Sequence, residues 1–367
     1  MYSIVFIKNK LTILFITVLF LNIKEVFMRH FGKLIFIFFA AIVVSSCGGG
    51  GSSSSSTAAT YTSSGSVGEV LSYSIDTTNK TYSYTILQSA YSLAGTTGSG
   101  TLTANSDGSY TPSENSNARV YNVSGGLLVG SAYLNLNGTN TNVPLLGVSS
   151  PVTTLSTLAG TYNYLRIGCT SPTSGTIASS NCSTTYGTIL IDSSGSYTTC
   201  TSANITTSTT CSSTTGTISY LSSGIWKAIR TGSTASNYLL AYDGGNSQVV
   251  LLIDTNDSGG YGYGHAVAST QVAVSSASGT YYKTSNNGRA GTIVPSSSTY
   301  SGSYTLSGVT YSESGTLSYN SPWNGFVTAT NSSTGSVGTA IVAGTGVYAY
   351  RNNEVNSTYW EVGIKSN

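Results

Sequence analysis

One pattern recurs three times along the chain: a stretch of strand-forming residues, a turn that contains glycine, and a second stretch that includes Ser-Tyr-Thr. The copies pair residues 100–102 with 109–111, 187–189 with 196–198, and 291–293 with 302–305. Strand, glycine turn and strand in this order are the sequence form of a β-hairpin. The pattern therefore predicts antiparallel β structure, with chance similarity in a Ser/Gly/Thr-rich chain as the alternative, above all for the first copy.

The second and third copies agree over a longer stretch. Residues 159–162 match 278–281 and residues 215–220 match 314–319, and Trp226 and Trp323 follow shortly after. A repeat of roughly 100 residues has the size of a domain and is too long for one turn of a solenoid. We therefore expect repeated β domains.

Composition favours strands throughout the body of the chain. Charged residues make up only 7%, whereas there are 27 tyrosines and many threonines, which suit pleated, half-buried surfaces. No helix is expected after residue 47. Val249–Ile253 is uninterrupted apolar, so that strand should be covered on both faces. The predicted fold class is all-β, with tandem small antiparallel domains that are either up-and-down barrels or sandwiches.

The expected domain boundaries follow from turn-rich stretches. After a Gly/Ser-rich tether over 47–66 we expect β domain 1 over 67–150, β domain 2 over 151–271 and β domain 3 over 272–367, with a linker at Pro151–Ser156.

Apolar residues concentrate near the amino terminus, in runs over 11–23 and 34–44. The second run is too short to span a bilayer, which needs about 20 helical residues. Arg29 and Lys33 precede it and small residues follow it, which is the layout of a secretory signal over 28–46. Because this signal is complete when translation starts at Met28, residues 1–27 are expected to be a misassigned upstream start, with an amino-terminal membrane helix as the alternative.

The signal ends on Val44-Ser45-Ser46-Cys47, a tetrad that resembles the lipobox of bacterial lipoproteins. The family pattern usually has Leu where this chain has Val44. The resemblance implies that Cys47 carries the lipid (diacylglyceryl and palmitate) and becomes the first residue of the mature chain. Gly48, in place of an aspartate that would favour retention in the inner membrane, implies lipid anchoring at the cell outer membrane, facing the periplasm or the surface.

The charge balance excludes one class of partner. Five of the 14 basic residues and one of the 12 acidic residues precede Cys47, so nine basic and 11 acidic residues remain in the mature chain. Binding of nucleic acid requires clustered Lys and Arg. We therefore expect no nucleic-acid partner, and a membrane partner through the lipid anchor alone.

Four cysteines follow Cys47, an even number that indicates disulfides in an exported chain. Three pairings are possible. We prefer Cys169–Cys182 with Cys200–Cys211, because each pair brackets a short loop-like stretch. A zinc site would need a C-x-x-C knuckle or nearby histidines, and the sequence has neither.

Few residues suggest catalysis, and we expect no catalytic residue and no cofactor. His265 is the single histidine of the mature chain, and without a G-x-S-x-G elbow it is expected to be a surface or turn residue near a strand end. The scattered acids favour no pair of the kind that glycosidases use.

Two further patterns could bind a ligand. Asp254, Asn256 and Asp257 form the densest group of oxygen ligands and are a calcium candidate, although an Asp/Asn/Gly turn is the simpler interpretation. Tyrosines spaced by two share one face of a strand. They could form an exposed face for sugars or a protein partner, or cross-strand contacts without function. Such pairs occur at Tyr82/Tyr84, Tyr162/Tyr164, Tyr261/Tyr263 and Tyr348/Tyr350.

The sequence thus favours a non-enzymatic lipoprotein with a structural or interaction role in the bacterial envelope. The alternative is a β-barrel module that binds a glycan or small ligand, and a hydrolase is a distant third. An open, lined cavity would support ligand binding, whereas filled sandwiches would support a structural role.

Overall fold

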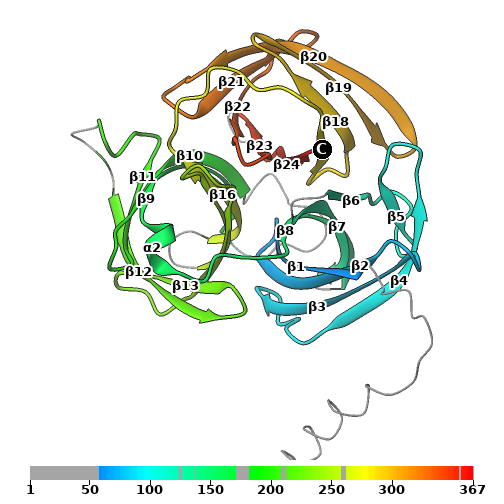
Figure 1. Ribbon diagram of the computed structural model, residues 1–367, viewed down its shortest axis with the longest axis horizontal. Coiled ribbons are helices and arrows are strands. Elements are labelled where there is room, and N and C mark those ends of the chain that lie inside the picture. Colours follow the sequence, from blue (N-terminus) through cyan, green and yellow to red (C-terminus); the bar gives the residue numbers. More distant parts are fainter. Residues whose placement is uncertain are drawn as a thin grey trace, which may run out of the picture. The chain divides into compact units, whose positions relative to one another are not determined.

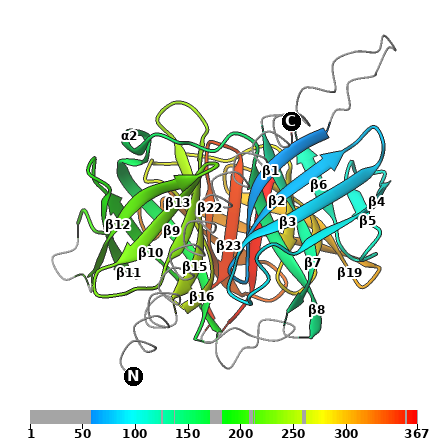
Figure 2. The same cartoon turned by 90° about the horizontal axis from the view of Figure 1, so that it is seen from below.

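The computed structural model describes residues 58–123, 126–136, 138–170, 182–207, 211, 213–257, 262–354 and 357–366. Within them, the strands form three closed barrels of eight antiparallel strands each (Figures 1 and 2). The prediction of tandem antiparallel β domains is confirmed, and the domains are barrels. No described helix is long and apolar enough to cross a bilayer. The predicted signal, Cys47 and Gly48 lie outside the described residues.

Barrel 1 closes through pairing of its first strand with its eighth. Its strands are β1 Ala58–Gly65, β2 Glu69–Asp76, β3 Thr81–Ser89, β4 Thr97–Ala104, β5 Tyr110–Pro112, β6 Val120–Val123, β7 Leu127–Leu136 and β8 Thr139–Val148. Strand β1 lies within the segment over 47–66 for which the sequence predicts a tether. Its Ser/Thr-rich composition is that of a linker, yet it pairs with β2 along its whole length and its last residues are buried.

Barrel 2 closes through pairing of β9 with β16. Its strands are β9 Gly160–Cys169, β10 Cys182–Ile191, β11 Ser196–Thr201, β12 Ser213–Ser222, β13 Ile225–Arg230, β14 Asn237–Asp243, β15 Val249–Asp257 and β16 Gly262–Thr270. One helical turn, α2 Leu155–Leu158, precedes β9, although no helix was expected here. It buries Leu158 at one end of the barrel.

Barrel 3 closes through pairing of β17 with β24. Its strands are β17 Tyr281–Ser285, β18 Ala290–Pro295, β19 Thr299–Leu306, β20 Val309–Tyr319, β21 Phe326–Asn331, β22 Val337–Val342, β23 Val347–Asn352 and β24 Trp360–Lys365.

The recurring hairpin occupies the same place in barrels 2 and 3 and a different place in barrel 1. In barrels 2 and 3 it joins the second and third strands, β10–β11 and β18–β19. In barrel 1 it joins the fourth and fifth strands, β4–β5. The second and third copies are therefore equivalent in the fold, whereas the first is a hairpin of similar sequence at another position.

Glycine and tyrosine pair across neighbouring strands inside the barrels. Tyr84 stands opposite Gly98, Tyr197 opposite Gly216, and a third pair joins Tyr300 to Gly315. In each pair the tyrosine ring occupies the space that a glycine Cβ would fill. An aromatic ring that covers a glycine shields its backbone and restores the packing that the missing side chain would provide. Each of these three glycines therefore makes room for the tyrosine on the neighbouring strand.

The outer faces of the barrels contribute to a single apolar cluster. Barrel 1 contributes Val129 and Leu146 among others, barrel 2 Val250 and Leu252, and barrel 3 residues of β24. The Val249–Ile253 run is therefore buried on both faces: Leu251 and Ile253 face the barrel interior, while Val250 and Leu252 join the shared cluster. The Tyr121 and Tyr282 rings stack in this cluster with their centroids 4.3 Å apart, which links barrels 1 and 3.

Candidate binding cavities in barrels 2 and 3

The three barrel interiors differ in how completely they are filled. In barrel 1 the rings of Tyr73, Tyr82 and Tyr84 stack, with centroid separations of 5.9 and 6.2 Å. The hollow that these rings line has no room for a water molecule. Barrel 1 is therefore a packed core at this level, whereas barrels 2 and 3 each enclose a cavity.

The barrel 2 cavity has a volume of about 330 Å³. Protein interiors contain few voids larger than a water molecule, and small-ligand sites start at about 300 Å³. The lining residues come from all eight strands. They are Tyr164, Arg166, Thr185, Ile189, Ile191, Tyr197, Thr199, Thr201, Thr214, Ile218, Ala228, Arg230, Asn237, Leu239, Leu251, Ile253, Thr255 and Ala266.

Strand register divides this lining into a polar and an apolar end. Arg166 pairs with Thr185 and Ala266 on the neighbouring strands, and two residues before it Tyr164 begins the apolar part. On the other side of the barrel, Arg230 marks the same polar level. The polar lining residues near this level are Arg166, Thr185, Thr199, Thr201, Thr214, Arg230, Asn237 and Thr255.

The apolar end is closed by the segment that leads into barrel 2. The Tyr162 hydroxyl donates to the Leu158 carbonyl oxygen at 2.9 Å, and the Trp226 indole donates to the Val152 carbonyl oxygen at 2.8 Å. Leu158 is fully buried against these rings. Helix α2 and its flanks thus cap the apolar end of the barrel.

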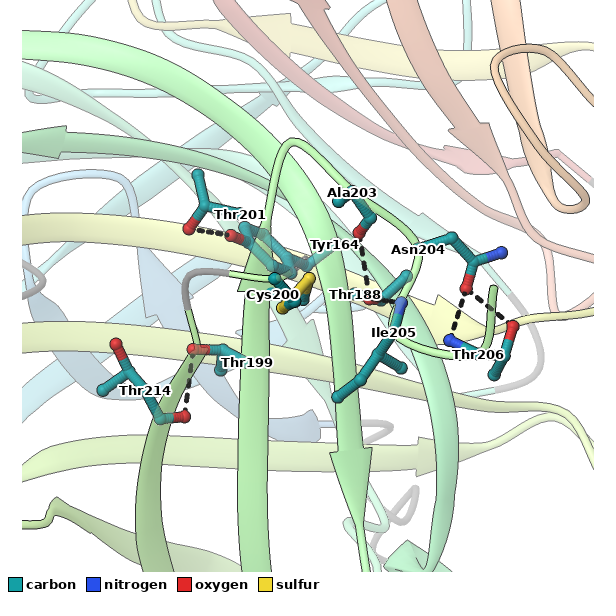
Figure 3. Close-up of a disulfide and its surroundings, with 11 residues drawn as sticks. Tyr164, Thr188, Thr199, Cys200, Thr201, Ala203, Asn204, Ile205, Thr206 and Thr214 are labelled. Carbon is teal, nitrogen blue, oxygen red and sulfur yellow. Dashed lines mark hydrogen bonds between the residues drawn. A yellow bond between two sulfur atoms is a disulfide. The ribbon is translucent and has the colours of Figure 1, made fainter. Parts of the chain in front are cut away.

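Both disulfides lie toward the polar end of barrel 2, and the expectation of disulfide bonds is confirmed. Cys169–Cys182 joins directly opposed residues of β9 and β10. Cys200–Cys211 ties β11 to the segment that follows it. Figure 3 shows that segment folded back on β10: Thr188 donates to the Ala203 carbonyl oxygen and accepts from the backbone of Ile205.

The neighbours of Cys200 on β11 point into the cavity. Thr199 and Thr201 line it, and the Tyr164 and Thr201 hydroxyls are hydrogen-bonded at 3.2 Å (Figure 3). The disulfide is therefore on the outer side of a strand whose inner side forms the cavity wall.

The barrel 3 cavity is larger, about 440 Å³, and its wall is charged. Lys283 forms ion pairs with Glu313 and with Glu361, the latter at 3.0 Å. The hydroxyls of Tyr348 and Tyr359 donate to the two carboxylate oxygens of Glu361 at 2.8 and 2.6 Å. Both oxygens of this buried carboxyl group therefore accept hydrogen bonds, which offsets the cost of removing them from water.

Burial and the ion pairs shift the pKa values of this network. Burial alone would lower the pKa of Lys283, but the two carboxylates outweigh it and raise that pKa, so the ammonium stays charged. Burial raises the pKa of Glu313 despite the opposing effect of Lys283. Burial, with the negative charge of Glu361, also raises the pKa values of Tyr348 and Tyr359, which therefore remain hydrogen-bond donors.

His265 differs from its sequence-based interpretation. The prediction of a surface or turn residue is wrong: it lies within β16, is 1% exposed, and its ring meets Trp360 edge-on at 5.8 Å. It points to the outer side of barrel 2, where burial lowers its pKa to about 3. His265 lines neither the barrel 2 cavity nor the barrel 3 cavity.

The calcium candidate also lies in a strand and not in a turn. Asp254, Asn256 and Asp257 all belong to β15, in which Asp254 and Asn256, two positions apart, share one face. Asp254 is fully buried on the outer side. Among the residues that the structure describes, no group of three or more His, Cys, Asp or Glu side chains could hold a metal ion.

Three of the four tyrosine pairs, those that the structure describes in full, face the barrel interiors. Tyr82, Tyr84, Tyr162 and Tyr164 are buried in the barrel cores, and Tyr348 and Tyr350 line the barrel 3 cavity. Tyr261 lies outside the described residues. The charged cavity residues were not predicted from the sequence, although the same spacing indicates them: Arg166 follows Tyr164 by two positions and Glu361 follows Tyr359 by two.

Comparison with known proteins is sparse. No protein-family model matches the chain, and no curated protein matches it. Among solved structures, the isotype 1 transferrin binding protein B of serogroup B Neisseria meningitidis matches at 11% sequence identity and a TM-score of 0.27. The match covers 82% of this chain and 66% of that one, so the chain spans just under two thirds of that protein.

Proposed function

We propose that this protein is a lipoprotein of the bacterial outer membrane that binds a small amphipathic ligand in barrel 2 and has no enzymatic activity. The observation that carries the proposal is the division of the barrel 2 cavity into an apolar end and a polar end with two arginines. The lipobox-like tetrad supports the envelope location. We therefore infer that the role of this protein in the envelope is to bind a ligand.

The cavity chemistry selects the ligand class. An apolar chain gains free energy when it leaves water for the Ile/Leu-lined end, at about 25 cal/mol per Å² of apolar surface buried. Arginine side chains and threonine hydroxyls at the other end can donate hydrogen bonds to a carboxylate or to another oxygen-rich group. A medium-chain fatty acid has both parts.

The test is calorimetric titration of the purified, full-length mature protein with dodecanoate. We expect saturable binding of one dodecanoate per chain. Ala228→Phe would fill the cavity from β13 and should weaken binding at least tenfold. Leu190→Phe is the matched control, because Leu190 lies on β10 among the cavity strands but is exposed on the outside.

Two results would contradict the proposal. One is a wild-type protein that binds no dodecanoate and carries no co-purified amphiphile by native mass spectrometry. The other is equal binding by Ala228→Phe and Leu190→Phe, which would place the ligand outside barrel 2.

A further inference from the structure

The barrel 3 cavity differs in chemistry from that of barrel 2 and suits a different ligand. Five tyrosines line it, and it contains three glutamates besides Lys283 and Arg289. The tyrosines are Tyr300, Tyr304, Tyr348, Tyr350 and Tyr359. This site is independent of the barrel 2 proposal, because the two linings share no residue.

Most of the charge in barrel 3 is already balanced. Lys283 lies between Glu313 and Glu361, and Glu361 has both of its oxygens occupied. We call Lys283, Glu313 and Glu361, with the hydroxyls bonded to Glu361, the frame of the cavity. Lys283 binds Oε1 of Glu313, and Oε2 of Glu313 takes part in none of the described hydrogen bonds.

Arg289 is the second cation of the lining, and Glu361 and the Tyr359 hydroxyl both interact with it. Its guanidinium lies over the rings of Tyr304 and Tyr359, 4.5 and 5.1 Å from their centroids. Within the described part of the chain it forms no ion pair, and its Nε is buried without a hydrogen-bond partner. Contact with two aromatic rings restrains the guanidinium, which carries five N–H donors and can offer one of them to a ligand.

We propose that barrel 3 binds a neutral saccharide. A sugar hydroxyl can both accept a hydrogen bond from Arg289 and donate one to Glu313, and a fully charged or fully apolar group cannot do both. The C–H face of the sugar ring packs on tyrosine, which offers an apolar face with a polar edge. The lining contains three carboxylates against two cations, so an acidic sugar would meet net repulsion.

The experiment is saturation-transfer difference NMR on the full-length mature protein with glucose, galactose and N-acetylglucosamine, their β-linked disaccharides, and glucuronate as the acidic comparator. We expect transfer to at least one neutral sugar and weaker transfer to glucuronate. Arg289→Lys keeps the charge but loses the planar fork, and should weaken the affinity at least tenfold. Ala329→Phe fills the cavity from β21 and should abolish binding.

Arg230→Lys in barrel 2 is the matched control and should bind the sugar as wild type does. Dodecanoate binding by Arg289→Lys should also be unchanged, so failure here is distinguishable from failure of the barrel 2 proposal. The inference is overturned if no neutral sugar shows transfer, if glucuronate alone does, or if folded Arg289→Lys and Ala329→Phe proteins both bind as wild type.

Discussion

Among single residues, Glu69 is an ionisable side chain of barrel 1 that is buried near Asp254 of barrel 2. It is fully buried on β2, where one carboxylate oxygen accepts hydrogen bonds from the Ser89 hydroxyl and the Ala90 backbone. The other oxygen is buried without a partner. Burial raises its pKa to about 8, so the protonated form is the folded form at neutral pH.

The pKa of Glu69 predicts that stability falls as the pH rises. In the unfolded chain this carboxyl ionises near its ordinary pKa of 4.5, whereas in the folded protein it stays protonated up to about pH 8. Between these values the free energy of unfolding should fall by up to about 1.4 kcal/mol per pH unit from this group. Glu69→Gln removes the titration, so in urea unfolding its stability relative to wild type should increase from pH 5 to pH 8. A constant difference would contradict the pKa shift.

Asp254 and His265 of barrel 2 are also buried ionisable residues whose pKa values are shifted by burial. Asp254 stands opposite His265 in the register of β15 and β16, and the negative charge of Glu69 adds to burial in raising its pKa. These residues place ionisable side chains in a packed interface between barrels. Sequence alone could not show this, because a lone histidine next to glycines resembles a loop residue until its strand and its neighbours from other barrels are known.

At the scale of strands, the glycine–tyrosine pairs predict a specific sensitivity to added methyl groups. A Cβ at Gly216 would meet the Ile229 carbonyl oxygen and the Tyr197 ring. Gly216→Ala should therefore lower the free energy of unfolding by about 1–3 kcal/mol, the usual cost of overpacking. Gly160→Ala is the control, since a Cβ there makes only ordinary contacts. Equal thermal stability of the two variants would contradict the pairing argument.

The strands also show what periodicity can and cannot predict. Alternation correctly places residues two apart on one face, which is why Tyr162, Tyr164 and Arg166 share the interior of barrel 2. It cannot say which face is inside, because in these barrels both faces can be apolar: Trp360 and Val362 face outward, while Glu361 faces the cavity of barrel 3. In a simple barrel strand the apolar residues face the interior and the polar residues face water. In β24 the apolar residues face outward, because they pack in the cluster shared with the neighbouring barrels.

At the scale of the whole molecule, the apolar run over Val249–Ile253 predicts burial on both faces, but not the identity of the covering elements. Strand β1 of barrel 1, far away in the sequence, contacts the strand that contains this run. Barrels 2 and 3 meet through other long-range contacts, such as those of Tyr186 with Trp323 and Phe326. Polar bonds accompany them: Arg351 Nε donates to the Thr184 hydroxyl at 3.0 Å, and the Trp323 indole donates to Asn163 at 2.7 Å. Such contacts fix barrels 2 and 3 to each other and depend on positions that no local pattern connects.

A lipid is proposed to hold the three-barrel body in the envelope. The proposed attachment is the lipid on Cys47, the cysteine of the lipobox-like tetrad. Cys47→Ser should lose incorporation of labelled palmitate and move from the detergent phase to the aqueous phase on Triton X-114 partition. Its dodecanoate affinity should not change, because the cavity lining lies in barrel 2. Unlabelled wild-type protein, or membrane-bound Cys47→Ser protein, would show that the envelope location rests on something other than a lipid.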